Sequence, residues 1–138
     1  MALSAIQGSA PGALRPEEQA VVRKLQARDR AVRAHEQAHL SAAGGLARGG
    51  PTYTYQRGPD GHMYAVGGEV SLDTSPIPGD PAATLAKARQ IQAAANAPAD
   101  PSPQDRSVAA AAAQMAAAAA LELGKAAEPK GTRLDLSA

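Results

Sequence analysis

The sequence predicts a small α+β domain, and three observations support this fold class. A stretch free of Gly and Pro runs from residue 17 to 43 and is long enough for one extended helix. Residues 52–66 alternate in character around a turn rich in Gly and Pro, as expected for a β-hairpin. Two further stretches, 80–96 and 102–123, have the composition of helices and are separated by prolines.

The domain expected from this pattern covers residues 16–123 of the 138-residue chain. Residues 1–15 are expected to form a disordered leader, and residues 124–138 a disordered polar tail. Most of the 44% hydrophobic fraction is alanine, and Phe, Trp and Cys are absent. The core should therefore be thin, and a metal ion or self-association could compensate, because disulfides are excluded.

Charge and hydropathy argue against several classes of partner. The formal net charge is +1, and no Lys/Arg cluster is flanked by aromatic residues, so nucleic acid is not expected. Residues 1–14 lack the basic and apolar regions of a signal peptide. The alanine tract at 109–120 is too short and too weakly hydrophobic to predict a membrane span. We expect a cytoplasmic protein, whose alanine-rich helix could pair with a second copy.

The first helix is expected over residues 16–43. Pro16 suits the first helical position, and the two glutamates that follow suit the positive end of the helix dipole. Gly44 and Gly45 are a strong stop signal.

The region 51–73 is expected to hold a β-hairpin and a short extended segment. Two alternating strands are joined by a Gly-Pro-Asp-Gly turn. Gly67 and Gly68 would then let the backbone bend or approach another element closely, and residues 69–73 are expected to follow as a short strand or extended segment.

Two helices are expected to complete the domain. Asp80 and Pro81 read as the cap and first residue of a helix over 80–96. The spacing of Ser102 and Asp105 resembles a capping box that starts a helix over 102–123, which Gly124 should end.

The feature with the clearest chemistry is a His-Glu-x-x-His pattern inside the first helix. His35 and His39 are four residues apart, so on a helix both imidazoles can face one metal ion. Zinc is the expected ion, and Glu36 would then act as general base on a metal-activated water. The pattern predicts a zincin-like domain with an active-site helix; the simpler interpretation is two solvated histidines.

Two histidines are too few for a zinc site, so a third ligand is expected. Glu69 is the first choice, because Glu69 and Asp73 have Glu-x-x-x-Asp spacing. A similar pair in thermolysin-type zinc peptidases supplies the third ligand and a carboxylate that orients a ligand histidine, although there it lies on a helix. Asp73 would take this orienting position, or belong to an ordinary turn. His62 is the alternative third ligand.

Three tyrosines, Tyr53, Tyr55 and Tyr64, fall in the predicted hairpin. They could contact substrate or an oxyanion, or they could form the aromatic part of a poor core.

Several segments resemble the SprA-related family of bacterial metalloproteases. The resemblance lies in residues 28–39, 49–56, 64–70, 73–76 and 97–105. It covers roughly residues 17–116 and implies a gluzincin-like zinc peptidase domain with His35, Glu36 and His39 in the family's positions.

The expected function is therefore a zinc-dependent endopeptidase that hydrolyses peptide bonds of a peptide or protein substrate. The alternative is a non-catalytic protein-interaction module whose metal site is structural or vestigial.

Overall fold

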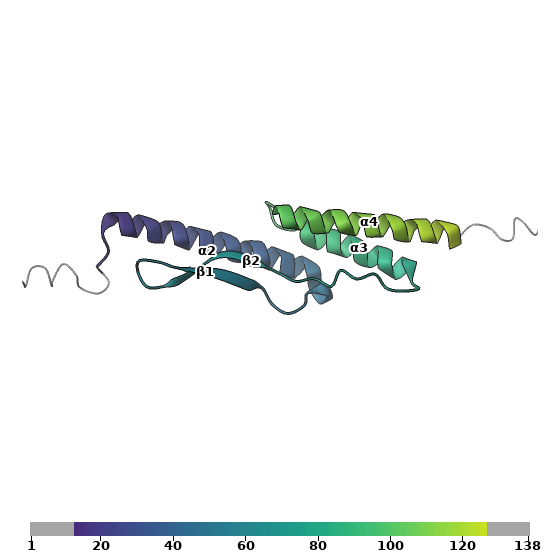
Figure 1. Cartoon of the computed structure of the whole chain (residues 1–138), viewed down its shortest axis with the longest axis horizontal. Helices are drawn as coiled ribbons and strands as arrows, with labels where there is room; N and C mark the ends of the chain where they lie inside the picture. Colours follow the sequence, from purple (N-terminus) through teal and green to yellow (C-terminus); the bar gives the residue numbers. More distant parts are fainter. Residues whose placement is uncertain (1–12, 127–138) are drawn as a thin grey trace, which may run out of the picture.

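The computed structural model describes residues 13–126, which form three α-helices and a two-stranded antiparallel sheet. The elements are, in chain order, α2 (Pro16–Ala43), the 3-10 helix η1 (Gly44–Leu46), β1 (Thr52–Arg57), β2 (Met63–Glu69), α3 (Pro81–Ala95) and α4 (Pro103–Ala126). Figure 1 shows the hairpin lying along α2, with α3 and α4 packed together beside the C-terminal part of α2. The fold class is α+β, as predicted.

Helix α2 covers the same residues as the helix expected from the sequence. Its first turn is closed by Glu18, whose carboxylate accepts a hydrogen bond from the backbone N–H of Arg15 at 3.0 Å. It ends at Ala43, and its C-cap Gly44 has a φ of +53°, a backbone conformation that residues with side chains disfavour.

The hairpin differs from expectation at its second strand. Thr54 pairs with Gly67 and Tyr55 pairs with Ala65, so Val66 is an extra residue that forms a bulge in β2. Pairing with β1 resumes after the bulge, and β2 continues through Gly67 and Gly68 to Glu69. Of the two roles expected for the glycines, a bend or a close approach, the structure shows a close approach at Gly68, where an added Cβ would come within 3.0 Å of Glu36 Cγ.

The segment after β2 is extended, as expected, and lies against the loop that follows α2. Leu72 forms an isolated bridge with Ala47. The backbone N–H of Arg48 donates to the carbonyl of Ser71 at 2.8 Å, and that of Asp73 donates to Leu46 at 2.9 Å.

Two adjacent side chains of α2 hold the edge of β2 that faces away from β1. Asp29 Oδ1 accepts a hydrogen bond from the backbone N–H of Ala65 at 2.7 Å. Arg28 Nε donates to the carbonyl of Val66 at 2.9 Å. Because two neighbouring backbone groups of β2 are tied to one turn of the helix, the rest of the strand is aligned along α2 toward the histidines.

The ends of α3 and α4 follow the capping chemistry with one exception. The side chain of Asp80 accepts from the N–H of Ala83 at 3.0 Å, so Asp80 is the cap and the helix proper begins at Pro81. The other end of α3 is Ala95, with Asn96 as the C-cap. Helix α4 runs through Gly124 to Ala126, so the predicted stop is wrong. Its neighbours are good helix formers, which outweigh the cost of one glycine, about 1 kcal/mol.

The core is built largely from alanine, and Ile91 of α3 is its largest fully buried side chain. The fully buried alanines come from α2, β2 and α3 and are Ala43, Ala65, Ala88 and Ala94. Small side chains let the helix backbones approach closely but bury little apolar area, so the core is thin, as composition suggested.

Helix α4 has 24 residues and extends beyond the alanine tract at 109–120 on both sides. Its best 18-residue window has a mean hydropathy of 1.3, and only 11% of that window is buried. Length and composition would therefore allow α4 to cross a membrane, although soluble proteins contain helices with the same properties.

Candidate metal centre

The two histidines of α2 point into one site, as their spacing predicts. Their Nε2 atoms lie 3.2 Å apart, and the rings meet edge to face. His39 is almost fully buried, and His35 is partly open to a cleft.

The third group at this site is Asp105, from the first turn of α4. Its Oδ2 lies 2.9 Å from Nε2 of His35 and 3.1 Å from Nε2 of His39. Among the described residues, these three side chains form a group able to hold a metal ion. The sequence did not single out Asp105 as a ligand.

Local sequence explains why Asp105 is held in place. Ser102 Oγ accepts from the N–H of Asp105 at 3.0 Å, and Asp105 Oδ2 accepts from the N–H of Ser102 at 2.9 Å. This is the capping box expected from the spacing, and it fixes the carboxylate at the helix start. The oxygen that caps α4 is the same oxygen that faces both histidines.

The three groups are close enough to one another to share one metal ion. Two ligand atoms bound to tetrahedral zinc at about 2.0–2.1 Å lie roughly 3.3–3.4 Å apart. The three nitrogen and oxygen atoms here are separated by 2.9, 3.1 and 3.2 Å. A small outward movement of each side chain would accommodate the ion, and two imidazoles with one carboxylate are a donor set that suits zinc.

A backbone carbonyl sets the tautomer of His39. Its Nδ1 lies 2.8 Å from the carbonyl oxygen of Ala94, which can only accept, so Nδ1 carries a proton and donates. In the neutral ring, Nε2 then presents a lone pair toward Asp105 and His35. A donor for this lone pair and for the carboxylate is supplied either by a proton on Nε2 of His35 or, in its place, by a metal ion bound among the three groups.

The electrostatics favour an anionic Asp105. Burial alone would raise the pKa of this carboxyl, but hydrogen bonds from the N–H of Ser102 and from His35 hold the pKa below its usual value. Asp105 is therefore available as a charged ligand across the neutral range.

Glu36 lies beside the three-group cluster and is only 4% exposed. Burial raises the pKa of its carboxyl, against the opposing influence of His35 and His39, and the negative charges of Asp105 and Glu69 raise the pKa further. A carboxylate with a raised pKa is a better proton acceptor than one in water.

The cluster opens into a cleft of about 590 Å³ bounded by α2, β2 and the start of α4. Arg28, Val32 and Glu36 line it from α2, and Val108 lines it from α4. Residues 67–72 form another wall. The site can therefore be reached by a molecule larger than water.

Glu69, the expected third ligand, lies on this wall at the end of β2 but is not one of the three groups brought together. It is exposed, and its charge acts on Glu36. The structure places Asp105 where the sequence suggested Glu69.

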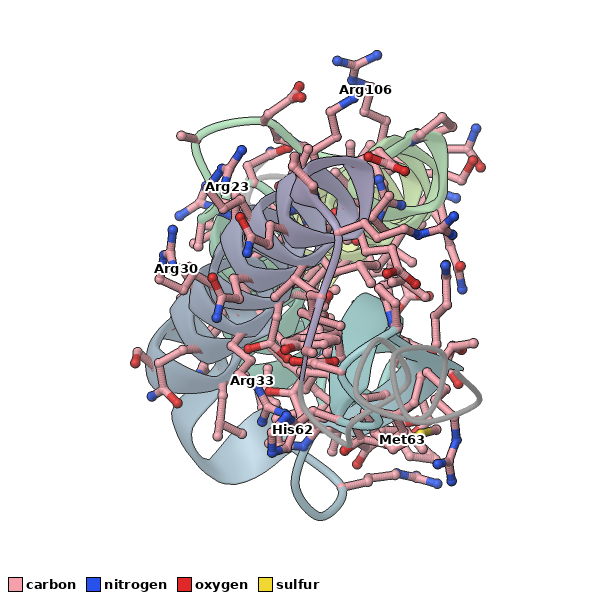
Figure 2. All side chains as sticks on the ribbon, turned by 90° about the vertical axis from the view of Figure 1, so that its left-hand side faces the viewer. Arg23, Arg30, Arg33, His62, Met63 and Arg106 are labelled. Carbon is pink, nitrogen blue, oxygen red and sulfur yellow. The ribbon has the colours of Figure 1, made fainter. Side chains whose placement is uncertain are left out.

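His62, the alternative ligand, lies far from the cluster. Its side chain is 78% exposed, with Nδ1 3.0 Å from Asp60 in the hairpin turn. This turn packs near Leu25, ten positions before His35, or about 15 Å along the helix. In Figure 2, His62 and Arg106, the neighbour of Asp105, lie on opposite sides of the molecule.

Asp73 does not orient a ligand histidine. Its carboxylate accepts from the hydroxyl of Ser75 at 2.6 Å and pairs with Lys87 at 3.1 Å and Arg48 at 3.2 Å. The Ser75 hydrogen bonds, with help from Lys87, lower the pKa of Asp73. The orienting contact to His39 comes instead from the carbonyl of Ala94.

None of the three tyrosines lines the cleft. Tyr64 is buried, and its hydroxyl donates to Asp60. Tyr53 packs edge to face with Tyr55, with ring centroids 6.2 Å apart, and beneath the guanidinium of Arg33. Their positions agree with a packing contribution and not with contact to a substrate in this cleft.

The signal that could have indicated Asp105 was its place in a capping box immediately after a rigid Pro-rich linker. Such a carboxylate is fixed in direction before any ligand arrives. Sequence alone does not give the position of that helix start relative to α2, because Asp105 follows His35 by 70 residues.

Comparison with known proteins identifies the family. The sequence profile of the SprA-related family matches residues 5–130, nearly the whole chain. No curated protein and no solved structure matches it. The matched region includes the histidine pair on α2, the strand that lines the cleft, and Asp105. The chain therefore belongs to the SprA-related family.

Proposed function

We propose that this protein is a zinc-dependent peptidase in which His35, His39 and Asp105 hold the ion and Glu36 is the general base. The observation that carries the proposal is the meeting of these three groups within 3.2 Å of one another, beside a buried carboxylate and at the floor of an open cleft. Asp105 replaces Glu69 as the proposed third ligand.

When bound, zinc supplies a Lewis acid that makes water acidic enough to lose a proton near neutral pH. Glu36 takes that proton as the water oxygen bonds to the peptide carbonyl carbon. Glu36 then delivers the proton to the amide nitrogen as the C–N bond breaks. One water is consumed, and one carboxylic acid and one amine are formed.

The wall of the cleft suits an extended peptide. β1 occupies one edge of β2, and Arg28 and Asp29 occupy its other edge at Val66 and Ala65. Beyond them, residues 67–70 line the cleft. A substrate could pair with this stretch as an added strand, which would lay its scissile bond across the cluster.

The test is Glu36→Gln, which keeps the shape of the side chain and removes its basicity. The variant should bind one equivalent of zinc. Its rate of hydrolysis of a mixed peptide library should be at least about 100-fold lower than that of wild type. Glu17→Gln, the same change at an exposed position of α2, should behave as wild type.

Two outcomes would contradict the proposal. Unchanged hydrolysis in Glu36→Gln would remove Glu36 from the reaction. A wild-type protein that holds one equivalent of zinc but cleaves nothing in the library would support the alternative function, an interaction module with a structural metal.

A further inference from the structure

A second, smaller pocket adjoins the cleft. It has a volume of about 300 Å³ and lies between one face of α4, Ile91 of α3 and Thr74. This pocket and the larger cleft share three lining residues, Thr74, Gln104 and Val108, so the two spaces adjoin. None of the residues named above as ligand or base lines the smaller pocket.

The lining of this pocket is mostly apolar. Helix α4 contributes four residues whose spacing places them on one helix face: Val108, Ala111, Ala112 and Met115. Ile91 of α3 is buried and forms the floor of the pocket. The polar groups, Thr74, Gln104 and Ser107, carry no charge. A space of this size with no ionisable group selects an aliphatic side chain and not a charged one.

The position of the pocket is fixed relative to the cluster by α4. Val108 follows Asp105 by one turn, about 4.5 Å along the helix axis. Met115 lies about 15 Å from Asp105 along the same axis. A residue whose backbone lies at the cluster can therefore place its side chain over Val108 and toward Ala111.

We infer that this pocket, named here the α4 pocket, is a specificity site that receives a leucine- or methionine-sized side chain beside the scissile bond. The inference rests on the proposed function and adds its substrate class, peptides with a large aliphatic residue at that position. The occupant is a substrate side chain because the α4 pocket shares three lining residues with the cleft that would hold the peptide.

Alanine at position 111 determines the room in the α4 pocket. Ala111 is exposed and lines the pocket, so Ala111→Leu fills the space without forcing atoms into the core. Ala113 is also exposed on α4 but lies on another face and does not line the pocket. Ala113→Leu is therefore a matched control with the same change in the same helix.

The experiment uses two peptide hydroxamates that differ only in carrying a leucine or a glycine side chain next to the metal-binding group. With the zinc-loaded full chain, the leucine compound should bind about tenfold or more tightly than the glycine compound. Ala111→Leu should reduce that ratio to about twofold or less, whereas Ala113→Leu should retain it.

Methyl signals of ¹³C-labelled methionine give a readout that does not depend on activity. The leucine compound should shift the Met115 signal, and the glycine compound should not. Met63 lies on the hairpin side of the molecule and is 51% exposed, so its signal is the internal reference.

Equal affinities for the two compounds, an unmoved Met115 signal, or a preference that survives Ala111→Leu would each overturn the inference. The α4 pocket and the proposed function fail in different ways. Cleavage of a peptide library without side-chain preference would retain the peptidase and remove the α4 pocket as a specificity site. A leucine preference in binding with no hydrolysis would retain the pocket and remove the peptidase.

Discussion

Gly68 lies directly against the side chain of Glu36: a Cβ on this glycine would come within 3.0 Å of Glu36 Cγ. The same Cβ would be 2.9 Å from Cδ1 of Tyr53 and 3.1 Å from the carbonyl oxygen of Thr52. Glycine at this position lets β2 approach the helix closely enough to bury the proposed base. At neighbouring Gly67, the nearest atom to a Cβ would be 3.8 Å away, which is ordinary contact.

This difference predicts opposite behaviour for two adjacent substitutions. Gly68→Ala should displace Glu36 or β2 and reduce stability by about 1–3 kcal/mol, the usual effect of overpacking. It should also lower the hydrolysis rate at least about tenfold, because a small misplacement of a catalytic group is costly. Gly67→Ala should be close to neutral. Urea unfolding and library hydrolysis would measure both; equal effects at the two positions would contradict the close approach.

The identity of the third ligand is tested by zinc affinity, measured in competition with a chromophoric chelator. Asp105→Ala and Asp105→Asn should each weaken zinc binding by at least about 100-fold, the upper end of the effect of an outer-shell contact. Glu69→Ala and His62→Ala should stay within a few-fold of wild type. A loss of affinity in Glu69→Ala equal to that in Asp105→Ala would return Glu69 to the ligand set.

Asp105 also caps α4, so loss of the cap needs its own control. Ser102→Ala removes the hydroxyl that accepts from the N–H of Asp105, at a cost of about 1 kcal/mol, while leaving all three proposed ligands. Its zinc affinity should fall less than that of Asp105→Asn, which keeps a capping oxygen. The opposite order would indicate that helix capping and not ligation explains the loss.

A pH dependence follows from Asp29, the residue that ties α2 to β2. A hydrogen bond from the N–H of Ala65, followed by one from Arg33, lowers the pKa of Asp29 from its ordinary 3.8. A carboxyl whose pKa is lowered by folding stabilises the folded state. This stabilisation is complete at a pH above the pKa of the unfolded state and is lost as the pH falls through the pKa of the folded state. The difference in the free energy of unfolding between wild type and Asp29→Asn should therefore be largest at pH 6–7, with wild type the more stable. This difference should narrow below about pH 4.

Urea midpoints at several pH values would measure this gap. Arg33→Gln keeps the contact from Asp29 to Ala65 but loses the ion pair with Asp29 and the contact with the Tyr53 ring. Of the two lost contacts only the ion pair titrates with Asp29, so the stability of this variant should still fall with pH, but by less than that of wild type. A gap between wild type and Asp29→Asn that stays constant from pH 7 to pH 3 would contradict the assignment.

Local signals in the sequence predicted much of this fold. Pro16 and Gly44 defined α2, and the spacing of Ser102 and Asp105 anticipated the capping box. The histidine pair was placed on one helix face by periodicity alone. Each of these depends on residues within one or two helical turns of one another, where geometry is nearly determined by sequence spacing.

The rest depended on tertiary arrangement. The bulge lies at Val66, whose carbonyl accepts the hydrogen bond from Arg28 of α2, and no local sequence pattern marks it. Gly124 read as a stop because glycine disfavours helix, yet its helix-forming neighbours prevail. The sequence indicates only a capping role for Asp105. Its distance to the histidines depends on how α3 and α4 pack beside α2.

The double role of Asp105 has a consequence for the order of events during synthesis. His35 leaves the ribosome 70 positions ahead of Asp105, which corresponds to roughly 4–14 s at about 5–20 residues per second. Throughout that interval the nascent chain carries the histidine pair without its carboxylate partner. The partner becomes fixed only when the first turn of α4 forms, so completion of the centre coincides with one of the last folding events of the domain.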